Sequence, residues 1–111
     1  MRNQKITMEE LTRFLQQTGY EFESTVTDQG TFSRRGGILD IFPVGSDNPY
    51  RIEFWGNEID SIRRFDPETQ KSISEINEFQ LFPANEILPS FLNISNLENM
   101  PKGILFWRAI L

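Results

Sequence analysis

The chain has 111 residues, enough for one modest domain, and a formal net charge of -5, which disfavours a surface that follows nucleic-acid phosphates. It contains no Cys and no His, which excludes disulfides, thiolate chemistry and the usual nucleophile–base triads. No apolar run approaches the about 20 residues of a membrane helix, and the N-terminus lacks a signal-peptide core, so we expect a cytoplasmic protein with no membrane partner.

The N-terminal segment has the pattern of an amphipathic helix. Thr7 and Glu10 match a capping box, in which a hydroxyl at the N-cap is followed three residues later by Glu. Apolar residues follow at helical spacing, and Gly19 is a natural stop just past the C-terminal end. We therefore predict a helix over residues 8–18.

After this helix the sequence shows the alternation and the turn residues of β-strands. We predict strands over residues 31–34, 37–44, 50–55 and 58–65, and a last one within 76–82. Gly56 and Asn57 form a two-residue loop that suits a primed hairpin turn. The predicted fold class is therefore α+β, an antiparallel β-meander sheet with an N-terminal covering helix, followed by a partly irregular C-terminal segment.

The composition changes near Pro83. Asn, Ser and Pro become frequent, and we interpret residues 84–101 as a mostly irregular or weakly helical connector. A strand-like apolar run follows over residues 103–107. This division predicts one domain over 1–83 and a separate segment over 84–111, as in a piece of a longer protein.

A hairpin closed by Gly56 and Asn57 defines the pairing of its two strands. The expected facing pairs are Trp55 with Glu58, Phe54 with Ile59, Glu53 with Asp60, and Ile52 with Ser61. Two carboxylates directly opposite each other are unfavourable, so water, a nearby arginine or a partner must relieve Glu53 and Asp60. Such a pair resembles the spacing of a retaining glycosidase, but that chemistry needs a deep cleft. A solvated polar face with ion pairs is the favoured interpretation, and a catalytic pair is the alternative.

Arginines and an exposed aromatic residue are expected around these carboxylates. Arg34 and Arg35 point to opposite faces of a strand, and the two glycines after them predict a bulge or a tight bend. Trp55 falls on the polar face, and a Trp flanked by charges is typical of protein interfaces. The residues alone leave a protein-binding surface and a merely solvated face equally open. A sheet that stacks single-stranded nucleic acid on Trp55 is a third possibility, which the acidic charge opposes.

Three stretches in order carry a resemblance to a known family: FSRRGGILDIFP, then PYRIEFWGNEIDSIRRFDPETQKS, then LFPANE. Over residues 19–86 the chain resembles the second domain of bacterial transcription-repair coupling factors (Mfd). That domain is similar to the UvrA-interacting domain of the excision nuclease subunit UvrB. The strings PYRIEFW and DPETQKS resemble Mfd more than UvrB, and residues 101–107 resemble the place where the Mfd chain re-enters its first domain. A UvrA-interaction domain of a UvrB-like subunit is the alternative.

The resemblance implies a protein-interaction module that recruits UvrA in transcription-coupled nucleotide excision repair. Full-length Mfd proteins are ATP-driven translocases that act on double-stranded DNA and displace stalled RNA polymerase. The second domain of the family has no ATPase motif, and no phosphate-binding loop pattern occurs here. We therefore expect a non-enzymatic segment without its own cofactor, with ATP, RNA polymerase and DNA bound by other domains of the parent protein.

The resemblance also implies site residues. The arginine before the glycine of the family pattern falls on Arg35, and the strand acid that contacts UvrA in UvrB falls on Glu53. Two positions where family members carry a cation are Ser33 and Glu21 here. With their neighbours, the expected UvrA-binding residues are Arg35, Glu53, Phe54, Arg51, Arg34 and Trp55. We expect this surface to be covered in the intact parent protein and exposed after the polymerase is engaged.

Overall fold

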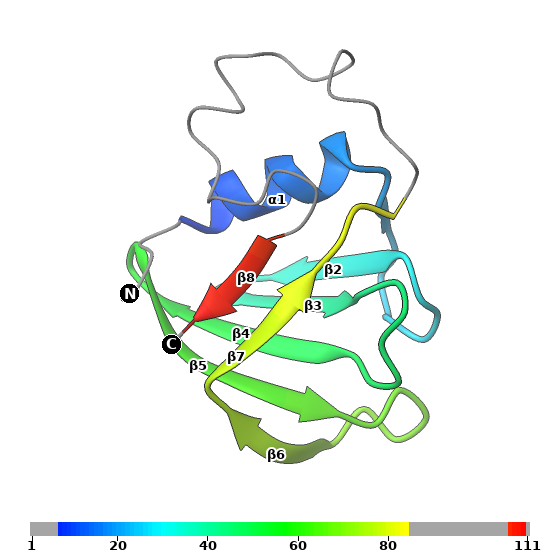
Figure 1. The fold of residues 1–111 in the computed structure, drawn as a ribbon. Helices are drawn as coiled ribbons and strands as arrows, with labels where there is room; N and C mark the ends of the chain where they lie inside the picture. The colour runs from blue at the N-terminus through cyan, green and yellow to red at the C-terminus, as the bar shows by residue number, and fades with distance from the viewer. Residues whose placement is uncertain (1–6, 85–106, 111) are drawn as a thin grey trace.

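The structure, a computed structural model, describes residues 7–84 and 107–110. It has one helix, α1 (Met8–Gln17), placed across a six-stranded sheet (Figure 1). The strands of this sheet are β1 (Glu21–Phe22), β2 (Thr31–Arg35), β3 (Ile38–Phe42), β4 (Tyr50–Trp55), β5 (Glu58–Phe65) and β6 (Ser72–Ile76). A second sheet pairs β7 (Glu78–Leu81) with β8 (Trp107–Ile110). The predicted α+β class is confirmed.

The predicted capping box starts α1. The Thr7 hydroxyl oxygen accepts a hydrogen bond from the Glu10 backbone N–H at 3.0 Å, and the Glu10 carboxylate accepts one from the Thr7 backbone N–H at 3.0 Å. These bonds satisfy two N–H groups that have no partner within the helix. The helix ends at Gln17, with Thr18 as C-cap and Gly19 at φ 100°.

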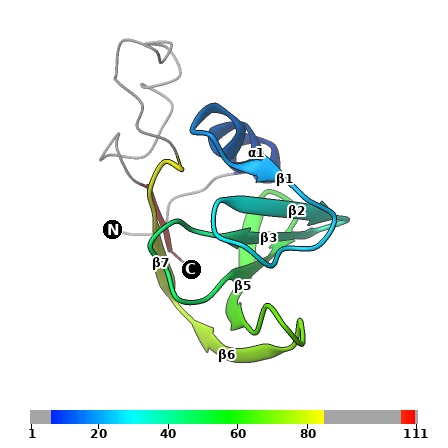
Figure 2. The ribbon, with the colours of Figure 1, turned by 90° about the vertical axis from the view of Figure 1, so that its right-hand side faces the viewer.

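The six strands lie in chain order, and each pair from β2 to β6 is antiparallel. The predicted meander is thus confirmed, with the short β1 added in parallel at one edge. The strand predicted within residues 76–82 is confirmed as β7, whereas β6 was not predicted. The chain forms β6 from Ser72 at the edge of the large sheet, and β7 then leaves that sheet to pair with β8 (Figures 1 and 2). Ser72 and Ser74 carry no strand signal, because β6 is an exposed edge strand.

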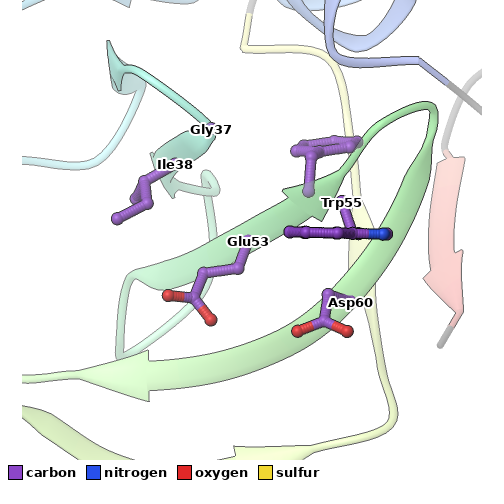
Figure 3. A pocket seen from close by; sticks show the side chains of 6 residues that line it. Gly37, Ile38, Glu53, Trp55 and Asp60 are labelled. Carbon is purple, nitrogen blue, oxygen red and sulfur yellow. The ribbon is translucent and has the colours of Figure 1, made fainter.

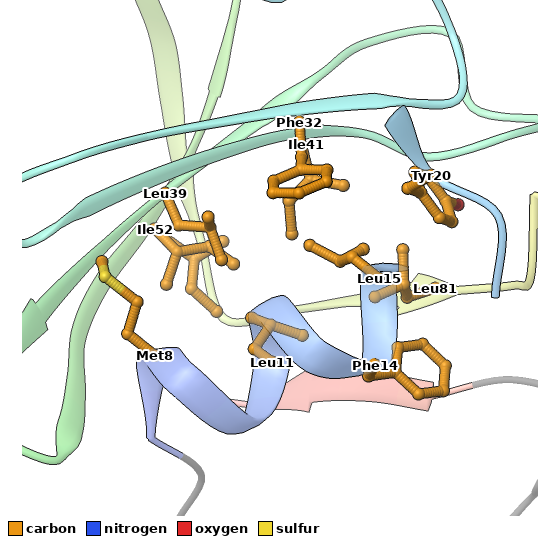
Figure 4. Close-up of a cluster of buried hydrophobic side chains, with 11 residues drawn as sticks. Met8, Leu11, Phe14, Leu15, Tyr20, Phe32, Leu39, Ile41, Ile52 and Leu81 are labelled. Carbon is orange, nitrogen blue, oxygen red and sulfur yellow. The ribbon is translucent and has the colours of Figure 1, made fainter. Parts of the chain in front are cut away.

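The main core lies between α1 and the sheet (Figure 4). Its buried members are Met8, Leu11, Phe14, Leu15, Tyr20, Phe32, Leu39, Ile41, Ile52, Ile62 and Leu81. A second cluster unites Val26, Phe42 and Phe65. Phe42 follows Ile41 in the same strand, so its side chain points to the opposite face of the sheet. Both faces of the meander therefore carry apolar contacts.

The predicted connector over 84–101 and the strand-like run over 103–107 lie almost entirely outside the described residues. The strand that is described there, β8, begins at Trp107 and pairs antiparallel with β7. Within the described residues, no helix is long and apolar enough to cross a membrane.

Candidate functional site

Two hairpin turns lie next to each other at one end of the sheet. Gly36 and Gly37 join β2 to β3, and Gly56 and Asn57 join β4 to β5. The first residue of each turn has a positive φ, 56° at Gly36 and 63° at Gly56, as primed hairpin turns require. The Gly37 carbonyl accepts a hydrogen bond from the Phe54 backbone N–H at 2.8 Å. The predicted bend at the two glycines is therefore a hairpin turn that is tied to the neighbouring hairpin.

A β-bulge changes the pairing that the hairpin loop predicts. Trp55 pairs with Glu58 and Phe54 with Ile59, as expected. Glu53, however, pairs with Ser61, so the prediction that it faces Asp60 was wrong. The bulge leaves Asp60 as an extra residue of β5, and the Ser61 hydroxyl donates a hydrogen bond to a Glu53 carboxylate oxygen at 3.0 Å. The expected register of Ile52 with Ser61 is wrong for the same reason, since Ile52 pairs with Ile62.

Side chains from both hairpins form one surface that we call the hairpin patch, made of Arg35, Ile38, Glu53, Trp55 and Asp60. Arg35 pairs with Ile38, which pairs with Glu53, so these three form a row across adjacent strands. An open depression of about 250 Å³ lies beside this row (Figure 3). It is lined by Gly37, Ile38, Glu53, Phe54, Trp55 and Asp60. The Trp55 side chain stands out into solvent, with 80% of the residue exposed.

The two predicted arginines of β2 have different environments. Arg34 points toward the helix side of the sheet, where its guanidinium lies 3.1 Å from the Glu9 carboxylate. The pKa of Glu9 is lowered, mainly by a backbone hydrogen bond and next by this contact with Arg34. The Arg35 side chain is exposed and forms no ion pair or hydrogen bond with another described residue. It stands two strands from Glu53, about 10 Å away, with Ile38 between them.

Arg51 is placed differently from the other predicted site residues. Its Nε and Nη2 donate hydrogen bonds to the two Asp40 carboxylate oxygens at 2.8 and 3.0 Å, and its Nη1 donates to the Gln70 carbonyl at 3.1 Å. The guanidinium carbon lies 4.3 Å from the centre of the Phe65 ring. The hydrogen bond to Asp40 raises the pKa of Arg51. With side-chain exposures of 17% for Arg51 and 4% for Asp40, this pair is part of the interior.

The structure thus places Arg35, Glu53 and Trp55 on one face at the hairpin ends. Arg34 points to the opposite face, and the Arg51 guanidinium, which interacts electrostatically with Glu53, is held by Asp40. Phe54 is half-buried, lines the depression and also packs against the main core. Sequence reasoning missed Ile38 as a surface residue and missed the free position of Asp60. The bulge that decides the place of Asp60 has no signal in the local sequence, because Gly56 and Asn57 predict only the turn.

The site presents apolar, aromatic and charged side chains around an open depression. A carboxylate pair that acts as acid and base works in a deep, partly desolvated cleft, whereas Glu53 and Asp60 border an open depression. One Glu53 oxygen is also engaged by Ser61. Among the described residues, no group of three His, Cys, Asp or Glu side chains is placed to hold a metal ion. Exposed aromatic and charged side chains side by side are typical of protein interfaces.

Comparisons with known proteins identify the family of the chain. The family model for the UvrB interaction domain matches residues 1–87. The transcription-repair-coupling factor of Haemophilus influenzae is 36% identical over 105 residues, 95% of this chain and 8% of that protein. The Escherichia coli transcription-repair-coupling factor is 38% identical over 77% of this chain. The Myxococcus xanthus transcription-repair-coupling factor is 46% identical over 70% of this chain.

The chain covers 7% of the length of the Escherichia coli protein and 6% of the Myxococcus xanthus protein, so each relative is far longer. The family match spans α1 and all of the strands from β1 to β7, and therefore both hairpins of the site. Because the matched segment, residues 1–87 of 111, is well over half of the sequence, the chain belongs to the family of UvrB interaction domains.

Proposed function

We propose that this chain is the UvrA-binding module of a transcription-repair coupling factor and that it recruits UvrA for nucleotide excision repair. The single observation that carries the proposal is the family match over residues 1–87, which spans the whole hairpin patch. Identities of 36% to 46% with transcription-repair-coupling factors favour this parent over a UvrB-like subunit.

The hairpin patch has the physical character of a binding surface. Trp and Arg are the residues most enriched at the energetic centres of interfaces, and here Trp55 is 80% exposed while Arg35 has no partner among the described residues. Both residues stand at the ends of hairpins that are joined by the bond from Phe54 to Gly37. This support holds the backbone of the patch in place before binding, which lowers the entropy lost on association. Arg35, Glu53, Phe54 and Trp55 are the contact residues of the proposal.

The other activities of the proposed parent belong to other domains. An ATP-dependent translocase would bind ATP, double-stranded DNA and RNA polymerase outside this chain, which serves as the adaptor to UvrA. We further propose that the hairpin patch is covered in the intact parent until the polymerase is engaged. A charged patch of this kind suits a reversible contact between domains, because such interfaces are more polar than permanent ones.

Titration of the purified chain with UvrA by calorimetry tests the proposal. Arg35→Ala and Glu53→Ala should each weaken binding by about tenfold or more, as loss of one partner from a charged interface contact does. Arg34→Ala is the matched control, because Arg34 is the adjacent arginine on the opposite face and pairs with Glu9. Circular dichroism of each variant checks folding. The proposal would be contradicted if the unsubstituted chain did not bind UvrA, or if Arg34→Ala and Arg35→Ala weakened binding equally.

Coverage of the patch in the parent is tested with the same titration. The isolated chain should bind UvrA more tightly than the intact parent does. Equal affinities would show that the patch is not covered.

A further inference from the structure

The depression in the hairpin patch presents one aromatic side chain and two carboxylates to solvent. Glu53, Trp55 and Asp60 project from the β4–β5 hairpin to the same side of the sheet (Figure 3). With 80% of Trp55 exposed, the faces of its indole are open for contact. The bulge places Asp60 and Ser61 together opposite Glu53, and it is this extra residue that brings the second carboxylate to the depression.

The acceptor capacity of these carboxylates is largely unused within the described residues. Asp60 is exposed and has no ion pair or hydrogen bond with another described residue. Glu53 is partly engaged, because its Oε1 accepts the Ser61 hydroxyl and forms an ion pair with Arg63 at 3.9 Å, and Arg51 interacts with it electrostatically. Among the described residues no hydrogen bond reaches the Glu53 Oε2. Arg35 stands two strands away, behind Ile38. The depression therefore combines negative charge with an uncovered aromatic ring, and no cation of the described chain sits over that ring.

We infer that this depression binds an arginine side chain of the protein partner, with the guanidinium stacked on Trp55 and its N–H groups donating to Asp60 and Glu53. The inference rests on the proposed function for the identity of the partner as UvrA. It adds Asp60 and Trp55 as the residues that select the partner, beyond the acid and arginine positions that the family pattern indicates.

Arginine fits this site better than lysine for three physical reasons. The guanidinium is planar and stacks on an indole, it offers several N–H donors in a fixed fork, and it is less strongly hydrated than an ammonium group. Two acceptors beside an aromatic face match that fork. An ammonium group would find the negative charge but would lose the stacking and the paired donors.

A titration that does not need UvrA tests the site itself. The Trp55 indole N–H signal of the ¹⁵N-labelled chain is followed by NMR with N-acetyl-arginine amide and, as control, with N-acetyl-lysine amide; Trp55→Phe identifies the signal. Arginine amide should shift the signal more than lysine amide does, and Asp60→Asn should reduce that shift. Glu23→Gln removes the same charge from an exposed residue outside the depression and should leave the shift unchanged. Equal responses to the two amides, or an unchanged response in Asp60→Asn, would overturn the inference.

A second titration, with UvrA, connects the site to the partner. Asp60→Asn and Trp55→Leu should each weaken UvrA binding by about tenfold, whereas Glu23→Gln should not. Replacement of the contacting UvrA surface arginine by lysine should weaken its binding to the unsubstituted chain. The same replacement should cause no further loss of affinity for the Trp55→Leu variant. If UvrA binds the unsubstituted chain and the variants Asp60→Asn and Trp55→Leu equally well, the inference fails and the proposed function stands. If the unsubstituted chain responds to arginine amide but does not bind UvrA, the proposed function fails and the arginine site stands.

Discussion

Replacing Arg51 with Ala should destabilise the domain strongly. The Asp40 side chain is only 4% exposed, and its two oxygens accept hydrogen bonds from Arg51 at 2.8 and 3.0 Å. Removal of one partner from a buried ion pair leaves an uncompensated charge and costs about 3–5 kcal/mol. Arg51 also donates to the Gln70 carbonyl and stacks on Phe65, so we place the loss in the upper half of that range.

Urea unfolding followed by circular dichroism measures this loss directly. Arg63→Ala is the matched control, because Arg63 occupies the position directly opposite Arg51 in the β4–β5 ladder. Its side chain, however, is 40% exposed and contacts Glu53 at 3.9 Å. Its removal should change the free energy of unfolding by less than about 1 kcal/mol. The double variant Arg51→Met with Asp40→Leu should recover much of the stability, since no unpaired charge remains. Similar losses for Arg51→Ala and Arg63→Ala would refute the reasoning.

Three further predictions concern stability. Burial raises the pKa of Tyr20 to about 12. The contribution of Tyr20 to the free energy of unfolding should therefore be constant below about pH 10 and should fall by about 1.4 kcal/mol per pH unit from there to about pH 12. Denaturation of Tyr20→Phe should lack this pH-dependent contribution. Thr7→Ala removes the helix cap and should cost about 1 kcal/mol in urea unfolding, while an unchanged midpoint would show that the cap is dispensable. Gly36→Ala should lower the melting temperature, because φ is 56° there and an alanine side chain strains that conformation; an unaltered melting temperature would contradict this.

Much of the fold was predictable because its signals are local. The capping box of Thr7 and Glu10 marks the start of α1, and glycines at the first position of two turns mark the hairpins. Each depends on residues within three or four positions of one another. The strand β6 escaped prediction because it is a mostly exposed edge strand, without the apolar alternation that a buried face imposes.

The candidate site was predictable only in part. Glu53 and Trp55 follow from the alternation of β4, and Arg35 from its place beside the glycine turn. Arg51 has the same alternation as Glu53, yet its guanidinium is held by Asp40 from the neighbouring strand. Alternation assigns a side chain to a face, but it does not say whether the loops beyond the sheet cover that face.

The sequence by itself determined the helix, the turns and the kinds of residue at the hairpin ends, since these depend on short-range backbone preferences and on period-two alternation. Only the tertiary structure decided the bulge that pairs Ser61 with Glu53 and places Asp60 at the depression, the burial of Arg51 with Asp40, and the side-by-side placement of the two hairpins through Gly37 and Phe54. The physical reason is that each of these depends on which strands pair and in which register, and pairing energy comes from residues that are far apart along the chain.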